Sequence, residues 1–141
     1  AIPSGNSVSA YNFIRLGRIL SRKDYEDIAF KTIDAFAYNL NRYSTGSSML
    51  LQAISLVKNP FYEVIVVGDI DKSLKLLDFI QKHPQPNKVL IYKDNIKDNK
   101  MFKYLDFYKS KENGEPLVYV CQNYSCKLPT NDIEKLNELL E

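Results

Sequence analysis

The sequence predicts an α+β protein in two parts: helical hairpins over residues 1–57, then a small, mainly parallel three-stranded α/β unit over residues 58–141. Three observations predict this class. Up to Val57 the apolar residues recur at steps of three and four, as on amphipathic helices. From Glu63 onward, short β-branched runs alternate with helical patterns, which is typical of strands joined by right-handed crossovers. Between the two patterns, Lys58-Asn59-Pro60 interrupts the helical periodicity.

The first part should contain three helices. The first, from Ser7 to Leu20, has apolar residues on more than one face, so we expect it to be packed on two sides. The second has one broad apolar face, and Ser21 with Asp24 three positions later is typical of a capping box at its start. The third, from Ser47 to Val57, should end at Asn59-Pro60. The inward positions of the second and third helices are Tyr25, Ile28, Ala29, Thr32, Ile33, Phe36, Ala37 and Leu40, and Leu50, Ala53, Ile54 and Val57.

The second part should alternate strands and helices. Strands are expected at 63–67, 88–92 and 117–120, because each is a short apolar run rich in β-branched residues. Asp71 should cap a helix that ends at His83-Pro84, and Met101 to Tyr108 should form a short helix. Asn113-Gly114 is typical of a turn. Asn131 and Glu134 should open a last helix. The inward residues of the two longer helices are Leu74, Leu77 and Ile80, and Ile133, Leu136, Leu139 and Leu140.

Composition excludes some classes of partner. The formal net charge is only +2 and no segment is strongly basic, so we expect no nucleic-acid binding. No apolar run approaches the ~20 residues that cross a bilayer, and we expect no membrane partner. Two cysteines do not make a secreted disulfide scaffold, so the sequence predicts a cytoplasmic protein.

Cys121 and Cys126 are the residues with the clearest capacity for chemistry. One hypothesis is that both are buried free thiols that only pack, since free cysteine behaves as a small hydrophobe. A second is a structural or redox disulfide, which a tight bend across residues 122–125 would permit by bringing the Cα atoms within roughly 7 Å. A thiol–disulfide role would then follow. A zinc site is the weakest hypothesis, because a structural site needs four ligands and the only histidine, His83, is placed at a helix end. We therefore expect no metal and no cofactor.

Ser4, Asn6 and Ser7 form a second candidate site. Gly5 permits a turn there, and Asn6 or Ser7 would cap the first helix. The same polar groups could bind a ligand, since loops on rigid scaffolds often do. Gly68 to Ser73 lies between a strand and a helix, but its two aspartates would repel phosphate, so we interpret it as a turn with a cap. With one histidine, no Ser-His-Asp set and no matched acid/base pair can be assembled.

Several segments together resemble one family. They are Ile2-Pro3-Ser4-Gly5-Asn6-Ser7-Val8 before a helix, Ile65-Val66-Val67-Gly68 after the hairpins, and residues 119–126 with Pro129 and a helix start at Asp132 and Glu134. This pattern is similar to that of the YyaL-type thioredoxin-domain-containing proteins, which include the spermatogenesis-associated homologues of animals. The likeness covers essentially the whole chain but only the carboxyl-terminal part of a family member.

The resemblance implies a larger parent protein. Family members carry an amino-terminal thioredoxin-like domain, followed by an α/α toroid similar to that of N-acylglucosamine 2-epimerases and six-hairpin glycosidases. Residues 1–57 would then close the toroid and residues 58–141 would form a terminal appendage. The parent would be carbohydrate-active and epimerase-like, with Ser4, Asn6 and Ser7 at the toroid mouth. The chain alone would be non-catalytic, with a structural or interaction role.

That position in a toroid also implies partners. Three helices cut from such a ring would expose apolar faces, which the remainder of the parent chain covers. In its absence we expect self-association through these faces, or packing of the helices against the sheet. The alternative function is a thiol–disulfide accessory that uses Cys121 and Cys126 with the parent's thioredoxin-like domain.

Overall fold

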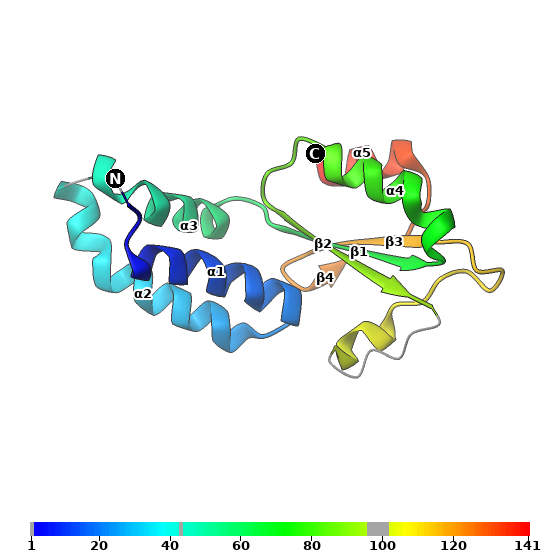
Figure 1. Cartoon of the computed structure of the whole chain (residues 1–141), viewed down its shortest axis with the longest axis horizontal. Coiled ribbons are helices and arrows are strands. Elements are labelled where there is room, and N and C mark those ends of the chain that lie inside the picture. Colours follow the sequence, from blue (N-terminus) through cyan, green and yellow to red (C-terminus); the bar gives the residue numbers. More distant parts are fainter. Residues whose placement is uncertain (1, 43, 96–101) are drawn as a thin grey trace. The chain divides into compact units, whose positions relative to one another are not determined.

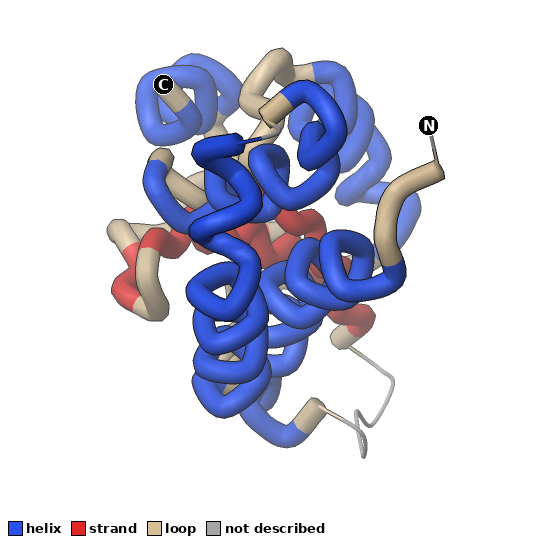
Figure 2. Tube along the Cα trace, turned by 90° about the vertical axis from the view of Figure 1, so that its left-hand side faces the viewer, coloured by secondary structure: helices blue, strands red, loops and turns tan. Residues whose placement is uncertain are grey.

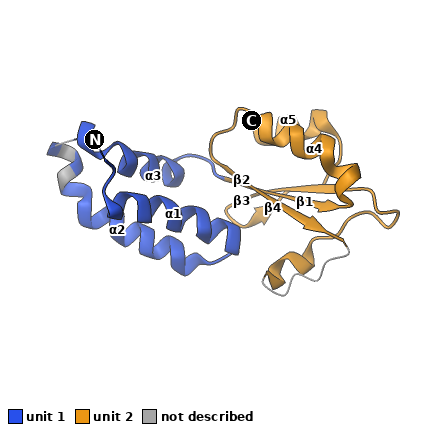
Figure 3. Ribbon diagram, in the orientation of Figure 1, with its two compact units in different colours: residues 1–61 blue, residues 62–141 orange. Residues whose placement is uncertain are grey.

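The computed structural model describes residues 2–42, 44–95 and 102–141. The protein is α+β, as the sequence predicts, with helices first and a small sheet after them (Figure 1). The chain divides into two compact units, residues 1–61 and residues 62–141 (Figure 3). The strands, red in Figure 2, all belong to the second unit. Each unit is described below by itself.

Unit 1 consists of helices α1 (Gly5–Leu20), α2 (Lys23–Arg42) and α3 (Ser48–Lys58), with a 3-10 turn at Thr45–Ser47. α1 packs against both α2 and α3, as its apolar residues on more than one face predict. Small residues make these contacts close, because Ala10, Ala29 and Ala53 are fully buried. At Gly17 of α1, an added Cβ would lie 2.8 Å from the Glu26 side chain on α2. Beside this contact Arg18 forms a buried ion pair with Glu26.

Two details of unit 1 differ from the prediction. Ser21 does not open the second helix but ends the first, in the left-handed conformation with φ 53°, and the Arg22 amide donates to the Gly17 carbonyl. The capping box with Asp24 is therefore wrong, because only two residues separate the helices and Ser21 is needed to reverse the chain. The inward faces are also less covered than expected. Ile28, Ala37 and Val57 are exposed, and the buried stripe of α3 is Leu50, Ala53 and Leu56.

Unit 2 contains a mixed sheet with strand order β2-β1-β3-β4. The strands are β1 (Tyr62–Gly68), β2 (Lys88–Asp94), β3 (Leu117–Gln122) and the short β4 (Ser125–Cys126). β1 and β2 are parallel, as predicted, and are joined by helix α4 (Ile70–Lys82). β3, however, runs antiparallel to β1. Leu117 pairs with Val67, so β3 starts at the same end of the sheet where β1 and β2 finish. The connection after β2 does not return the chain to the opposite end, and the strand direction is therefore reversed.

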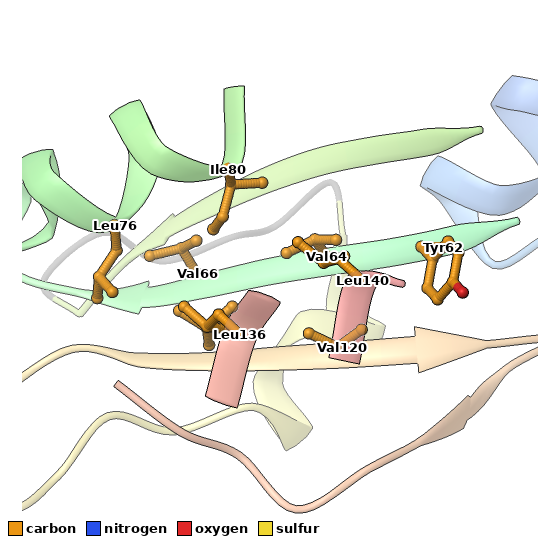
Figure 4. Close-up of a cluster of buried hydrophobic side chains, with 9 residues drawn as sticks. Tyr62, Val64, Val66, Leu76, Ile80, Val120, Leu136 and Leu140 are labelled. Atoms are coloured by element: carbon orange, nitrogen blue, oxygen red, sulfur yellow. The ribbon is translucent and has the colours of Figure 1, made fainter. Parts of the chain in front are cut away.

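The two faces of the sheet have different covers. On one face lie α4 and α5 (Ile133–Leu140), and their side chains meet those of β1 and β3 in the main core (Figure 4). This core comprises Tyr62, Val64, Val66, Leu76, Ile80, Val118, Val120, Leu136 and Leu140. On the other face Ile65, Val67 and Cys121 pack against Leu105 and its aromatic neighbours. These belong to the segment around a 3-10 helix, η2 (Lys103–Phe107). The segment stands where a short helix is predicted, and Met101 lies outside the described residues.

The helix ends in unit 2 follow capping chemistry. α4 is capped by Asp69, whose carboxylate accepts from the Asp71 amide, so the prediction of Asp71 as the cap is wrong by two residues. α4 ends at His83 as expected. α5 is capped by Asp132, which accepts from the Glu134 and Lys135 amides, and not by Asn131. Leu74 and Ile133, expected inward, are exposed, because the buried stripes are Leu76 with Ile80 and Leu136 with Leu140. Among the described residues, no helix has the length and apolarity to cross a membrane.

Candidate thiol–disulfide site

Cys121 and Cys126 face each other across a tight hairpin. β3 and β4 are connected by Asn123 and Tyr124, which have φ of 52° and 64°. Two consecutive residues with positive φ make a type I′ turn, the geometry that suits the twist of a two-residue hairpin. In the resulting register Cys121 pairs with Cys126 and Gln122 pairs with Ser125. The bend across residues 122–125 therefore brings the two cysteines together.

The two cysteines form a disulfide, with their Cα atoms 3.8 Å apart. Backbone hydrogen bonds hold the returning segment against β3: the Lys127 amide donates to Val120, and Val118 exchanges two bonds with Thr130. The two halves of the disulfide differ in exposure. Cys121 is 2% exposed and belongs to the aromatic face of the sheet, whereas Cys126 lies on an exposed edge strand. Solvent therefore reaches this disulfide from the side of Cys126.

A tyrosine hydroxyl lies beside both sulfur atoms. Tyr108 Oη is 3.5 Å from Cys126 Sγ and 3.9 Å from Cys121 Sγ. Because a disulfide sulfur carries no hydrogen, the hydroxyl must be the donor. The Tyr108 ring packs edge-on against Tyr119, with the ring centroids 4.9 Å apart. The buried Lys93 ammonium fixes the backbone here by donating to the carbonyls of Leu105 and Tyr108, at 2.8 and 3.0 Å. The hydroxyl is thus held in place by packing and by the lysine.

A buried carboxyl group lies on the strand next to Cys121. Glu63 of β1 is paired with Cys121 of β3 in the sheet register and is 4% exposed. Alternation along β1 places Glu63 on the same face as Ile65 and Val67, which pack around Cys121. Side chains directly opposite each other on neighbouring strands have Cβ atoms about 5 Å apart. Glu63 is therefore the acidic neighbour of the buried half of the disulfide.

The surroundings keep the nearby phenols protonated. Burial raises the pKa of Tyr108, and Glu63 and Tyr119 raise it further. The pKa of Tyr104 is raised to about 12 by burial, by Tyr108 and by Glu63. Burial lowers the pKa of Lys93, with Lys109 acting in the same direction. At neutral pH the Tyr108 hydroxyl consequently remains a hydrogen-bond donor to the sulfur atoms.

The second candidate site has the structure of a helix cap. Ser4 is the N-cap of α1, and its Oγ accepts from the Ser7 amide at 3.2 Å and lies 2.7 Å from the Ser7 hydroxyl. The prediction that Asn6 or Ser7 is the cap is therefore wrong, because α1 already begins at Gly5. Ser7 is buried and Asn6 is exposed. The cap accounts for Ser4 and Ser7, whereas the exposed Asn6 takes no part in it.

The remaining candidates have structural roles. His83 ends α4, where its Nδ1 accepts from the Gln85 amide and its carbonyl accepts from the Lys88 ammonium. Within residues 2–42, 44–95 and 102–141, no three His, Cys, Asp or Glu side chains form a group suited to a metal ion. Gly68 ends β1 where Pro116 approaches, since an added Cβ would lie 2.7 Å from the Pro116 Cα. The segment from Gly68 to Ser73 is a turn with a cap, as interpreted from the sequence.

Sequence reasoning found the cysteines but missed Glu63 and Tyr108. Glu63 was included only as the first residue of a strand. A charged residue beginning a run that is otherwise fully apolar is the signal that could have drawn attention to it. Tyr108 is one of ten tyrosines, and nothing in its local sequence distinguishes it from the others.

Fold and site together define a small α/β unit whose cross-strand disulfide has a tyrosine hydroxyl beside both sulfur atoms and a buried glutamate on the neighbouring strand. The comparisons give its relatives. The protein of Homo sapiens named spermatogenesis-associated protein 20 is 30% identical to this chain over 144 residues. The proteins of the same name from Rattus norvegicus and Mus musculus are 31% identical over 144 residues. The chain is homologous to a segment of these proteins, which confirms the resemblance to the spermatogenesis-associated homologues.

The match covers a much larger share of this chain than of its relatives. It covers 99% of this chain but only 18% of each relative. The chain thus spans about a fifth of the length of the curated relatives it matches. No family model and no solved structure matches the chain.

Proposed function

We propose that unit 2 takes part in thiol–disulfide exchange through Cys121 and Cys126. The observation that carries this proposal is the disulfide itself, with one exposed and one buried sulfur and a fixed hydroxyl beside both. Exchange requires access of a thiolate to one sulfur in line with the S–S bond. Exposure of Cys126 on an edge strand supplies that access.

The shortness of the loop that the disulfide closes supports a reversible bond. The two cysteines are only five residues apart, so opening the disulfide frees a short hairpin and leaves the pairing of β1 with β3 in place. A cytoplasmic location, which we propose from the composition, would add to the argument. In that compartment disulfides are mostly transient and belong to catalytic or redox-sensing proteins.

The test is native-state reduction. The oxidised chain is exposed to dithiothreitol at pH 7.5, quenched with N-ethylmaleimide and analysed by mass spectrometry, while circular dichroism monitors the fold. We expect two labelled thiols and an unchanged fold, followed by re-formation of the disulfide in oxidised glutathione. A disulfide that reacts only when urea unfolds the chain would refute exchange and leave a structural cross-link.

The exchange partner we propose is a dithiol in the parent protein. The resemblance implies a thioredoxin-like domain upstream, and its two thiols would reduce Cys121–Cys126. The full-length parent, with Cys126→Ser, would then accumulate fewer oxidised upstream thiols than the parent with Ser125→Ala, an exposed neighbour in the same hairpin. Equal thiol states in the two variants would exclude this partner.

Unit 1 supports a second function, as one section of a larger helical assembly. Its helices leave large apolar side chains at the surface, and α2 and α3 enclose a hollow of about 290 Å³. Phe30, Ile33, Ile54 and Val57 line this hollow beside Asp34 and Lys58. Since the chain spans only 18% of its relatives, we propose that further helices of the parent cover this face, as in an α/α toroid.

The isolated chain offers the test. We expect it to self-associate, and Val57→Asp should shift the mass measured by light scattering towards the monomer. Lys58→Asp, next in sequence and in the same hollow, is the matched control. A wild-type chain that is monomeric at all concentrations and binds no hydrophobic dye would contradict the proposed covering.

A carbohydrate-active parent is the remaining proposal from the resemblance. Asn6 would contribute to sugar binding, since it is exposed and, unlike Ser4, is not used as the cap of α1. Calorimetry of the full-length parent against a sugar panel should detect saturable binding that Asn6→Ala removes. Binding that Asn6→Ala leaves unchanged, or no binding to any sugar, would oppose it.

A further inference from the structure

The two sulfur atoms of the disulfide have different chemical surroundings, and this difference assigns them different roles. Cys126 lies on the exposed edge strand, whereas Cys121 is 2% exposed and points into the aromatic face of the sheet. An attacking thiolate must be able to approach the sulfur with which it bonds. The accessible target is therefore Cys126, and Cys121 is the sulfur that leaves.

The leaving sulfur would be released into a poor environment for negative charge. Burial disfavours a thiolate. This applies to Cys121, which is 2% exposed. Cys121 consequently needs a proton as the S–S bond breaks. The carboxyl group of Glu63, opposite Cys121 on β1 and 4% exposed, is placed to supply it.

We propose that the disulfide opens at Cys126, and that Glu63 gives its proton to Cys121 across the β1–β3 pair. This inference rests on the proposed exchange function. An incoming thiolate forms a bond to Cys126 Sγ while the Cys121–Cys126 bond breaks. Its electron pair goes to Cys121 Sγ, which takes the carboxyl proton and becomes a thiol. Glu63 is left as a carboxylate and regains a proton from the medium.

The second step completes the redox balance. The partner's second thiol, as thiolate, attacks its own sulfur in the mixed disulfide and releases Cys126 as a thiolate, which solvent protonates. The partner dithiol is oxidised to a disulfide and Cys121–Cys126 is reduced to two thiols. Tyr108, whose hydroxyl is 3.9 Å from Cys121 Sγ, can donate a hydrogen bond to the departing sulfur during the first step.

Other titratable groups face this cluster and define the controls. They are Lys93 on β2, Tyr104, Asp106, Tyr108 and Lys109 in the covering segment, and Tyr119 on β3. On the helix side of the hairpin, Glu138 of α5 lines a cavity of about 320 Å³ together with Cys121 and Lys127. Glu138 is exposed, so solvent should screen its charge. Glu138→Gln is therefore the matched control for Glu63→Gln.

The first experiment identifies the attacked sulfur. The oxidised chain is mixed with glutathione for a short time, acid-quenched and digested, and the glutathione adduct is located by mass spectrometry. We expect it on Cys126. In the single-cysteine variants, Cys121→Ser should leave a thiol that iodoacetamide alkylates rapidly, and Cys126→Ser one that reacts at least tenfold more slowly. An adduct on Cys121, or equal alkylation rates, would overturn the assignment even if exchange itself occurs.

The second experiment tests the proton transfer. Reduction by dithiothreitol is followed from pH 6 to 9 and divided by the concentration of attacking thiolate. We expect Glu63→Gln to slow this rate at least tenfold at pH 6, within the usual contribution of a general acid, and Glu138→Gln to leave it unchanged. Rates equal to wild type in Glu63→Gln would refute the role of Glu63.

A separate readout covers the case in which Glu63→Gln alters packing. In the Cys126→Ser background, removal of a neighbouring carboxylate should increase the thiolate fraction of Cys121 and hence its alkylation rate at pH 8. A purely structural Glu63 would leave this rate the same. Native-state reduction that fails altogether would instead refute the exchange function, so the two failures are distinguishable.

Discussion

Loss of the disulfide should destabilise unit 2 only moderately. The substitution to make is Cys126→Ser, because Cys126 is exposed and its replacement removes the cross-link with little loss of packing. The buried Cys121 remains as a free thiol within the aromatic face. The control is Ser125→Ala, an exposed neighbour in the same two-residue strand.

The magnitude follows from the length of the closed loop. The two cysteines are separated by five positions. For a loop of that size the chain-entropy relation gives a loss of about 7 cal/mol/K in the unfolded state, or about 2 kcal/mol at 25 °C. A loop of a hundred residues would give about 4.7 kcal/mol by the same relation. Since domains are typically stable by about 5–15 kcal/mol, unit 2 should stay folded without the bond.

The assay is amide hydrogen exchange with mass spectrometry on peptides from β1 and β3. The slowest amides there report opening of unit 2 itself, which a signal from the whole chain would not separate from unit 1. We expect Cys126→Ser to speed their exchange by a factor of about thirty, corresponding to about 2 kcal/mol. A loss of stability above about 4 kcal/mol, or an unfolded unit 2, would show that the fold of unit 2 depends on the disulfide. No loss at all would refute the entropic reasoning.

Three further predictions concern other contacts. Tyr108→Phe removes a hydroxyl that lies 3.5 Å from Cys126 Sγ, and reduction by dithiothreitol should slow about fivefold, as for loss of about 1 kcal/mol. Tyr92→Phe, which removes a bond to the Gly68 carbonyl, should not change that rate. Gly17→Ala should destabilise unit 1 by about 1–3 kcal/mol in urea unfolding, because its Cβ would meet Glu26 at 2.8 Å, whereas Gly5→Ala has open space and should not. Stability should also fall between about pH 10 and 12, because the folded-state pKa of Tyr104 is raised from 10.0 to about 12. A group whose pKa is higher in the folded state contributes stability below its unfolded-state pKa, and this stability is lost as the pH rises through its folded-state pKa. The urea midpoint should therefore fall less with pH in Tyr104→Phe than in the wild type. Equal pH profiles for wild type and Tyr104→Phe would contradict this assignment.

Most of the element order could be predicted because periodicity is a local property. The β-branched run at 64–67 and the stop at Asn59-Pro60 needed no tertiary context, and both stand in the structure. The helix caps could be predicted less well, because several polar residues near the start of each helix are able to serve as its N-cap. Asp69 and Asp71 are both suitable in sequence, and the backbone at the end of β1 decides for Asp69.

The direction of β3 could not be predicted from its residues. Parallel and antiparallel strands use the same apolar runs, and the choice depends on where the connection delivers the chain. With no full helix described between β2 and β3, the chain enters β3 from the end where β2 finishes. How far the apolar faces of the helices are buried could not be predicted either, because an apolar stripe does not show whether the helices that cover it belong to the same segment.

The sequence by itself determined the α+β order and the likeness to the spermatogenesis-associated proteins, whereas a disulfide between Cys121 and Cys126 was one of three hypotheses. These depend on residues close together in the chain. Only the tertiary structure placed Glu63 opposite Cys121 and brought Tyr108 to the sulfur atoms, because strand register and packing join residues that are 58 and 13 positions apart. A disulfide's chemistry depends on such neighbours, so the roles of its two sulfur atoms became visible only in the folded unit.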